Sequence, residues 1–131
     1  MNTDPEIRVY SVGDDWEIWV GKTATANDRL SLKIGHPNDF WFHVAGMPGS
    51  HVVARHPSRP VQCTREVKRL AAGYAAFFSK ARTAGKVAVH WTTCKNVGKR
   101  RGAPAGQVVL KKYDVIKTEP IEPPAMEETQ S

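Results

Sequence analysis

Residues 39–55 read DFWFHVAGMPGSHVVAR, and this stretch decides the fold. Its first part alternates, with Phe40 and Phe42 on one side of the chain and Trp41 and His43 on the other, as in a β-strand with two different faces. The next five residues, AGMPG, place glycine and proline where a tight reversal of the chain needs them. The residues after this turn alternate again, so the stretch predicts a β-hairpin.

The two strands of this hairpin are expected over Asp39–Val44 and Ser50–Arg55. If the two phenylalanines belong to the core, Trp41 and His43 face outward or into a shallow groove. An aromatic ring beside histidine and arginine suits stacking on an unpaired base there. The alternative, which the sequence leaves equally open, is a two-sided core that buries Trp41 and holds His43 as a satisfied interior polar group.

The flanking sequence predicts further strands and two helices. Alternating apolar residues bounded by turn residues predict strands over residues 8–12, 16–22, 86–93 and 107–116. We expect a helix over 25–34, with Thr25 as its cap, the aspartate three positions later reaching back, and Gly35 at its end. A second helix is expected over 64–82, with Thr64 as its cap. These elements predict one α+β domain, a mainly antiparallel sheet with two helices.

The charge of the chain is concentrated in its middle. The net charge is +6, but residues 18–118 hold 18 of the 19 Lys and Arg and only four of the 13 acids, which gives this region +14. Such asymmetry indicates a polyanionic partner, either nucleic acid or an anionic membrane surface. The simpler interpretation is a solvated surface that keeps the protein soluble.

Length and composition restrict the class of protein. A chain of 131 residues favours one domain, and its apolar runs are far shorter than the ~20 residues that cross a bilayer. The first residues, MNTDPE, do not resemble a signal peptide, so we expect a cytoplasmic protein without a membrane partner. Cys63 and Cys94 are too far apart for a Cys-x-x-Cys site and are expected to be free thiols.

A loop rich in glycine and basic residues, KNVGKRRGAPAG, begins at Lys95. Its glycines let backbone amides approach a phosphate, while Lys95, Lys99, Arg100 and Arg101 supply positive charge. The spacing of a Walker loop is absent, so the pattern favours contact with a phosphate backbone over nucleotide hydrolysis. The alternative is a mobile surface loop that binds nothing specific.

The residues suited to catalysis or to metal binding are poorly arranged for either. Ser50 and His51 are neighbours on a strand and point to opposite faces, so they cannot pair as nucleophile and base. The histidines and cysteines lack the spacing of a metal site. We therefore expect no catalytic residue, no cofactor and no bound metal. An RNA-processing or RNA-modifying enzyme that uses His43 or His51 remains the alternative, as does a basic module that binds an acidic protein.

Several motifs, taken in order, resemble the NFACT-R domain, the RNA-binding module of the NFACT proteins of ribosome-associated quality control. They are NDRL at 27–30, DFWFH at 39–43, PGSHVV at 48–53, SKAR at 79–82, and KNV at 95–97 with GA at 102–103. The resemblance covers residues 8–118 and implies an RNA context, with tRNA, rRNA or the large ribosomal subunit as partner. It suggests a stand-alone form of the domain, which would not direct tailing of a nascent chain by itself.

The resemblance also carries over candidate RNA-binding residues. Those that match the family motifs are Asn27, Trp41, His43, Ser50, His51, Arg55, Ser79, Lys80, Arg82, Lys95 and Asn96. Of these, Trp41, His43, His51 and Arg55 are expected to form the more selective patch. Where the family often has Lys-Lys-Pro, this chain has Lys99-Arg100-Arg101, which keeps the charge and loses the rigid proline. Residues 1–7 are expected to form a polar lead, and 119–131 a disordered acidic, proline-rich tail.

Overall fold

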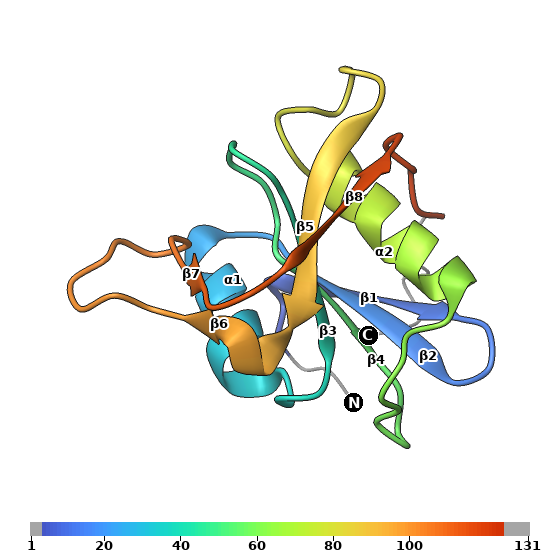
Figure 1. Cartoon of the computed structure of the whole chain (residues 1–131), viewed down its shortest axis with the longest axis horizontal. Helices are drawn as coiled ribbons and strands as arrows, with labels where there is room; N and C mark the ends of the chain where they lie inside the picture. The colour runs from blue at the N-terminus through green and yellow to red at the C-terminus, as the bar shows by residue number, and fades with distance from the viewer. Residues whose placement is uncertain (1–3, 125–131) are drawn as a thin grey trace.

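The computed structural model describes residues 4–124, and a six-stranded antiparallel sheet lies at its centre, in the order β1-β2-β4-β3-β5-β8. The strands are β1 (Ile7–Val12), β2 (Trp16–Gly21), β3 (Phe40–Val44), β4 (Val52–Arg55), β5 (Val87–Thr93) and β8 (Asp114–Thr118). Two short strands, β6 (Val97–Gly98) and β7 (Val109–Leu110), form a separate sheet (Figure 1). The predicted α+β class, with a mainly antiparallel sheet and two helices, is confirmed.

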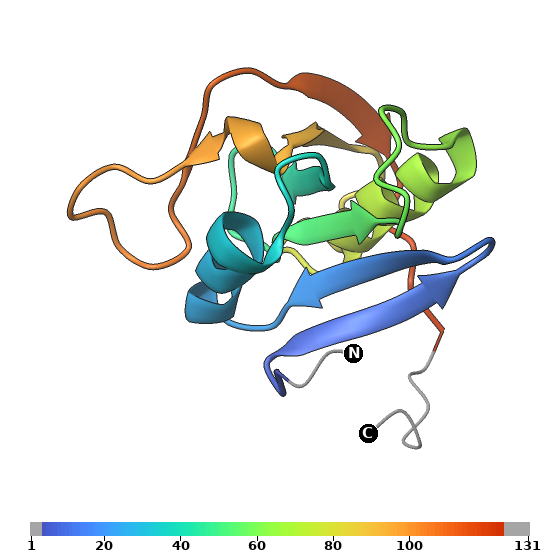
Figure 2. The ribbon, with the colours of Figure 1, turned by 90° about the horizontal axis from the view of Figure 1, so that it is seen from below.

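The two helices cover opposite faces of the sheet. α1 (Ala24–Arg29) continues as the π-helical turn η1 (Leu30–Ile34), and α2 (Arg65–Phe77) packs on the other side (Figure 2). A single 3-10 turn, η2 (Cys94–Asn96), follows β5. The sheet therefore has two apolar faces, and every strand in its middle must alternate between two cores.

The hairpin of β3 and β4 supplies both cores. Phe40 and Phe42 pack with α2 in the larger cluster, while Trp41 and Val53 pack with α1 and η1 in the smaller one. Trp41 is only 1% exposed, so the two-sided core is the alternative that the structure bears out. Trp41 pairs in register with Val53, so residues that face the same core lie opposite each other on the two strands.

The return strand begins two residues later than the sequence predicts. The amide of Ser50 donates to the carbonyl of Phe78 at 2.9 Å, and the amide of His51 donates to Oδ1 of Asn27 at 3.0 Å. These bonds go to the end of α2 and to α1, which leaves them unavailable for the ladder with β3. The segment before Val52 therefore joins the hairpin to both helices.

The first helix starts earlier than predicted. Its cap is Thr23, whose Oγ1 accepts from the amide of Ala26 at 3.0 Å, and not Thr25. Asp28 does not reach back to the helix start, because its carboxylate binds the ammonium of Lys99 and the amide of Gly106. Gly35 does end the helical segment, but with an extended backbone in place of the expected left-handed cap.

The second helix is capped by Thr64, as predicted, but it ends at Phe77, five residues before the predicted end. Phe78 leaves the helical conformation, and Ser79 forms an isolated bridge with Gly49. The Ser79 hydroxyl donates to the carbonyl of Ala76 at 2.7 Å and accepts from the amide of Ala81 at 3.0 Å. Side-chain and bridging bonds thus replace the last predicted turn, and they hold the following segment beside the hairpin.

The ends of the domain also differ from the sequence prediction. The expected strand over 107–116 is split, since β7 pairs with β6 and β8 pairs with β5. The predicted polar lead contributes to the fold, because Ile7 is 4% exposed in β1. At the other end, the amide of Ile121 donates to the carbonyl of Gly73 at 3.0 Å, so the predicted tail starts too early. The part of that tail over 125–131 lies outside the described residues.

The position of the α1 cap gives a first test. Replacing Thr23 by alanine removes the acceptor of the Ala26 amide and should lower the free energy of unfolding by about 1 kcal/mol. The matched change Thr25→Ala lies at an exposed position inside α1 and should alter it by less than about 0.5 kcal/mol. Urea unfolding followed by tryptophan fluorescence measures both variants. A loss at Thr25 that equals or exceeds the loss at Thr23 would contradict the assignment.

Candidate functional site

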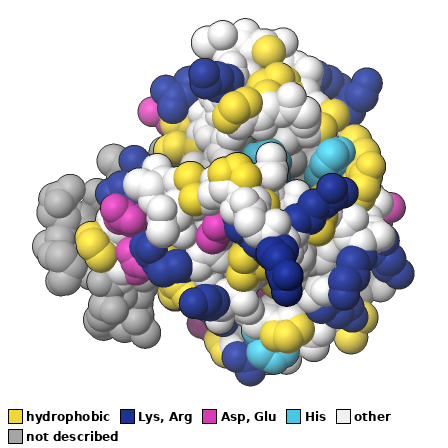
Figure 3. All heavy atoms as spheres, turned by 90° about the vertical axis from the view of Figure 1, so that its left-hand side faces the viewer, with side chains coloured by type: hydrophobic (Ala, Val, Ile, Leu, Met, Phe, Trp, Pro, Cys, Tyr) yellow, Lys and Arg dark blue, Asp and Glu magenta, His cyan; other side chains and the backbone are white. Residues whose placement is uncertain are grey.

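A cleft of about 1110 Å³ opens between the two helical ends and the hairpin turn. Four segments wall it: the start of α1, the turn over 46–51, the segment over 78–82 after α2, and the loop over 104–108. In Figure 3, histidine side chains lie in a hollow on this face, with Lys and Arg side chains around it. The volume slightly exceeds the range of about 300–1,000 Å³ typical of small-molecule pockets.

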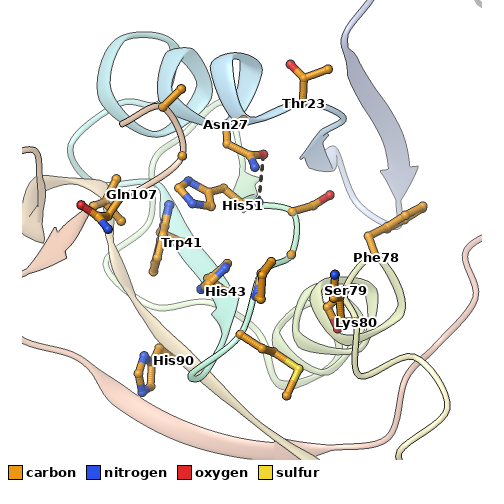
Figure 4. A pocket seen from close by; sticks show the side chains of 18 of the residues that line it. Thr23, Asn27, Trp41, His43, His51, Phe78, Ser79, Lys80, His90 and Gln107 are labelled. Atoms are coloured by element: carbon orange, nitrogen blue, oxygen red, sulfur yellow. Dashed lines mark hydrogen bonds between the residues drawn. The ribbon is translucent and has the colours of Figure 1, made fainter. Parts of the chain in front are cut away.

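The floor of the cleft comes from the hairpin and its neighbour. Trp41, His43 and His51 point into it from the hairpin, and His90 comes from β5 (Figure 4). The ring centroids of His51 lie 5.1 Å from those of His43 and 5.2 Å from those of Trp41. His43 and His90 are register partners on adjacent strands. The strand alternation that buries Phe42 thus gathers three histidines on the opposite face.

A buried hydrogen-bond chain fixes the floor to the helix. The indole Nε1 of Trp41 donates to Oγ of Ser31 at 2.7 Å, and the same oxygen lies 2.8 Å from Nδ1 of His51. The Ser31 hydroxyl has one donor and two acceptor sites, so it can bind the indole and the imidazole at the same time, and the tautomer of His51 sets which group donates in the second bond. Both Trp41 and His51 are 1% exposed, so their rings are rigid parts of the site.

His43 and His51 are uncharged at neutral pH. Burial, with a smaller contribution from the nearby His90, lowers the pKa of His43 to about 4. Burial likewise lowers the pKa of His51 to about 4, with a smaller contribution from His43. Uncharged imidazole both donates and accepts, which suits the polar edge of a base or a ribose better than a phosphate.

Positive charge is arranged around the rim. Arg8, Lys22, Lys80 and Arg82 line the cleft, and among residues 4–124 no Asp or Glu does. Arg82 donates to the carbonyl of Phe77, and Lys22 donates to that of Pro5, so both are held in place. The ammonium of the exposed Lys80 has no hydrogen-bond or ion-pair partner in the described part of the chain. A phosphate at this rim would meet several cations and no repelling carboxylate.

One exposed aromatic ring stands at the mouth of the cleft. Tyr113 is 49% exposed and packs against His90, with ring centroids 4.3 Å apart. The sequence prediction missed both residues. The alternation of His90 with Val89 and Trp91 could have shown that it faces away from the main core. The sequence does not predict that Tyr113 lines the cleft, because the expected continuous strand over 107–116 leaves out the break between β7 and β8 that contains this residue.

The basic loop forms one wall of the cleft, and Lys99 holds it in place. The ammonium of Lys99 forms an ion pair with Asp28 at 2.9 Å and also donates to the carbonyls of Pro104 and Gln107. The second carboxylate oxygen of Asp28 accepts from the amide of Gly106 at 3.0 Å. Lys99 is therefore a clamp that folds the loop against α1, although the sequence suggested a phosphate contact. Arg100 and Arg101 are exposed beyond it.

The structure brings together eight of the fourteen candidate residues. Those that line the cleft are Asn27, Trp41, His43, Ser50, His51, Ser79, Lys80 and Arg82. Lys95, Asn96, Lys99, Arg100 and Arg101 do not line it. Neither does Arg55, which pairs with the buried Asp39 at 3.2 Å and packs over the ring of Trp19. The expected selective patch is thus missing its arginine, and Trp41 offers almost no exposed ring surface for stacking.

The described residues show no membrane-spanning helix and no metal-binding cluster, and their two cysteines are free. None of their helices is both long enough and apolar enough to cross a bilayer. They contain no cluster of three or more His, Cys, Asp or Glu that could hold a metal ion. Both cysteines are free, and burial raises the pKa of Cys63 to about 11 and that of Cys94 to about 12.

The chain belongs to the NFACT protein RNA-binding domain family, whose model matches residues 7–112. It is similar to Rqc2 homolog RqcH of Streptococcus suis (strain 05ZYH33), with 37% identity over 105 residues, 80% of this chain and 18% of that protein. RqcH of Bacillus subtilis (strain 168) is 34% identical over 113 residues, 86% of this chain and 19% of that protein. The chain therefore spans about a fifth of the length of these curated relatives.

A solved structure shares the fold. The C-terminal part of the fibronectin/fibrinogen-binding protein from Streptococcus suis superposes with a TM-score of 0.81 at 33% identity. The match covers 93% of this chain and 47% of that one. The family predicted from the ordered motifs is confirmed by these relatives.

The clamp can be tested without any ligand. Asp28→Ala removes the acceptor of both Lys99 and Gly106, so amide exchange at Gly106 should rise at least about tenfold. Arg100→Ala, an exposed change in the same loop, should leave that rate as it is. Hydrogen exchange measured by NMR reads the single amide. An unchanged rate in Asp28→Ala would show that the loop is held by something else.

The depressed histidine pKa values predict how stability varies with pH. Between pH 6.5 and about 4 the unfolded chain binds protons that folded His43 and His51 do not, so stability falls as pH falls. Each ring should cost about 2 to 3 kcal/mol by pH 4.5. Urea unfolding at pH 7.5 and 4.5 should show the loss from both rings in the wild type and about half of that total loss in His43→Gln, which keeps one ring. The control His36→Gln, outside the cleft, should match the wild type, and equal losses in all three proteins would refute the assignment.

Proposed function

We propose that this chain is a non-catalytic RNA-binding protein, which holds RNA in the cleft and on the basic surface around it. The observation that carries the proposal is the charge of the cleft, lined by Arg8, Lys22, Lys80 and Arg82 and by no acidic residue of the described chain. Cations that converge on an open hollow favour a phosphate backbone. The description of the family as an RNA-binding domain supports RNA as the polyanionic partner.

The RNA is proposed to be structured, such as tRNA or ribosomal RNA, in ribosome-associated quality control or another part of cytoplasmic RNA metabolism. The likeness to RqcH proteins supports this context. Contact with the large ribosomal subunit belongs to the same proposal. Because the chain spans about a fifth of those relatives, their activity as whole proteins is not assigned to it.

His43 and His51 support binding over catalysis. A general base works best with a pKa near the operating pH, whereas burial lowers the pKa of His43 and His51 to about 4. Nδ1 of His51 is already bonded to Ser31, and the ring is 1% exposed. If incubation with tRNA yields cleaved or modified product, and His51→Ala abolishes that turnover while binding persists, the chain is an enzyme instead.

Salt dependence tests the binding mode. The affinity for tRNA should fall steeply between 50 and 200 mM salt, since each phosphate contact adds about 0.7 to 0.9 to the slope of log K against log salt. Lys80→Gln should reduce the magnitude of that slope by about 1. Arg65→Gln removes the same charge at the opposite end of α2 and should leave the slope unchanged. Fluorescence anisotropy with labelled tRNA measures all three proteins.

Two results would overturn the proposal. Weak binding to tRNA and rRNA fragments at low salt would mean that RNA is not the polyanionic partner of the cleft, and it would favour an acidic protein as that partner. A shallow salt slope, identical in Lys80→Gln and Arg65→Gln, would mean that the cleft rim does not contact phosphate.

A further inference from the structure

We infer that the cleft takes an unpaired nucleotide of the RNA, whose base stacks on Tyr113 while the cations that line the cleft hold its phosphate. This inference rests on the proposed RNA binding and specifies which part of the RNA enters the site. A duplex offers phosphates on its outside but keeps the faces of its bases stacked within, so an exposed aromatic ring gains nothing from it.

Exposure singles out Tyr113 among the rings of the cleft. Trp41 is 1% exposed, and the ring of Phe78 is covered by the guanidinium of Arg8, which lies 4.9 Å from its centroid. Tyr113 and Met47 are the two large exposed apolar side chains that line the cleft in the described chain. A base placed between the turn over 46–51 and Tyr113 would bury apolar surface that is now open to water.

The ring of Tyr113 is held ready for stacking. Asp114, the next residue, pairs in register with Trp91 on β5, and His90 of the same strand lies against the tyrosine ring at 4.3 Å. Strand pairing therefore fixes the backbone on one side of Tyr113, and the contact with the tilted ring of His90 restrains the side chain. Its exposed area remains available to a planar ligand.

The other surfaces of the cleft complement a nucleotide. The uncharged His43 and the hydroxyl groups of Ser50 and Ser79 line the same cleft as Tyr113 and the cations, and they supply its polar groups. Base edges and ribose hydroxyls both donate and accept, and uncharged donors and acceptors match them without a net charge. Lys80 is exposed and its ammonium has no partner in residues 4–124, so it is the cation best placed to take a new phosphate.

The decisive experiment compares three RNAs with the same number of phosphates. One is a blunt hairpin, the second carries an unpaired overhang in place of the terminal pairs, and the third has that overhang with abasic sites. Fluorescence anisotropy at fixed salt should give the overhang RNA about tenfold tighter binding than the other two, which is the scale of one base–aromatic stack. The mononucleotides AMP, CMP, GMP and UMP should compete only weakly, since they lack the neighbouring phosphates.

Substitutions locate the stack on the ring. Tyr113→Ala should lose the preference for the overhang while keeping the affinity for the blunt hairpin, and Tyr113→Phe should restore it. Val115→Ala, at an exposed apolar position on β8 outside the cleft, is the matched control and should bind like the wild type. Thermal unfolding of each variant confirms that the domain stays folded.

The outcomes separate this inference from the proposed function. If the blunt hairpin binds as tightly as the overhang RNA, or if Tyr113→Ala keeps the preference, the nucleotide site is wrong while RNA binding stands. Mononucleotides that bind as tightly as the overhang RNA would make the cleft a site for free nucleotides and would also overturn it. If none of the RNAs binds at low salt, both proposals fail.

Discussion

The hydroxyl of Ser31, shared between the indole of Trp41 and the imidazole of His51, is the interaction on which the cleft depends. All three groups are almost fully buried, and leaving one of them unpaired would cost about 1–3 kcal/mol. Their two hydrogen bonds hold η1 against the hairpin. In the helix that continues into η1, Asn27 accepts from the backbone amide of His51 and Asp28 accepts from the amide of Gly106, so two walls of the cleft are attached to this one helical segment.

Local patterns in the sequence predict most of the fold, because they depend on neighbours within a few residues. Alternation identifies the hairpin, and a cap followed by an apolar stripe identifies α2. The errors occur where a distant residue intervenes. Ser79 bridges to Gly49 and ends α2 early, and the split of the last predicted strand follows from pairing of β7 with β6. A sequence pattern carries no information on such partners until the chain is folded.

The candidate site shows the same division. Family motifs identify the hairpin histidines and the segment after α2, whereas Lys99 and Arg55 look like free cations in the sequence and are paired in the structure. Acids that the sequence places outside the basic middle help to create this pattern. Asp4 and Glu6 bind Arg29, at 2.8 and 3.4 Å, away from the cleft. Pairing thus neutralises cations elsewhere and leaves the rim of the cleft positive.

The bridge between Gly49 and Ser79 has a consequence for the thermodynamics of binding. A Cβ at position 49 would lie 2.7 Å from that of Ser79, so this close approach requires glycine. The turn over 46–51 is thereby fastened to the end of α2 before any ligand arrives. Ordering this wall therefore consumes conformational entropy during folding and none on association. Recognition by a preorganised wall of this kind depends on fit, and a ligand of the wrong shape cannot remodel it.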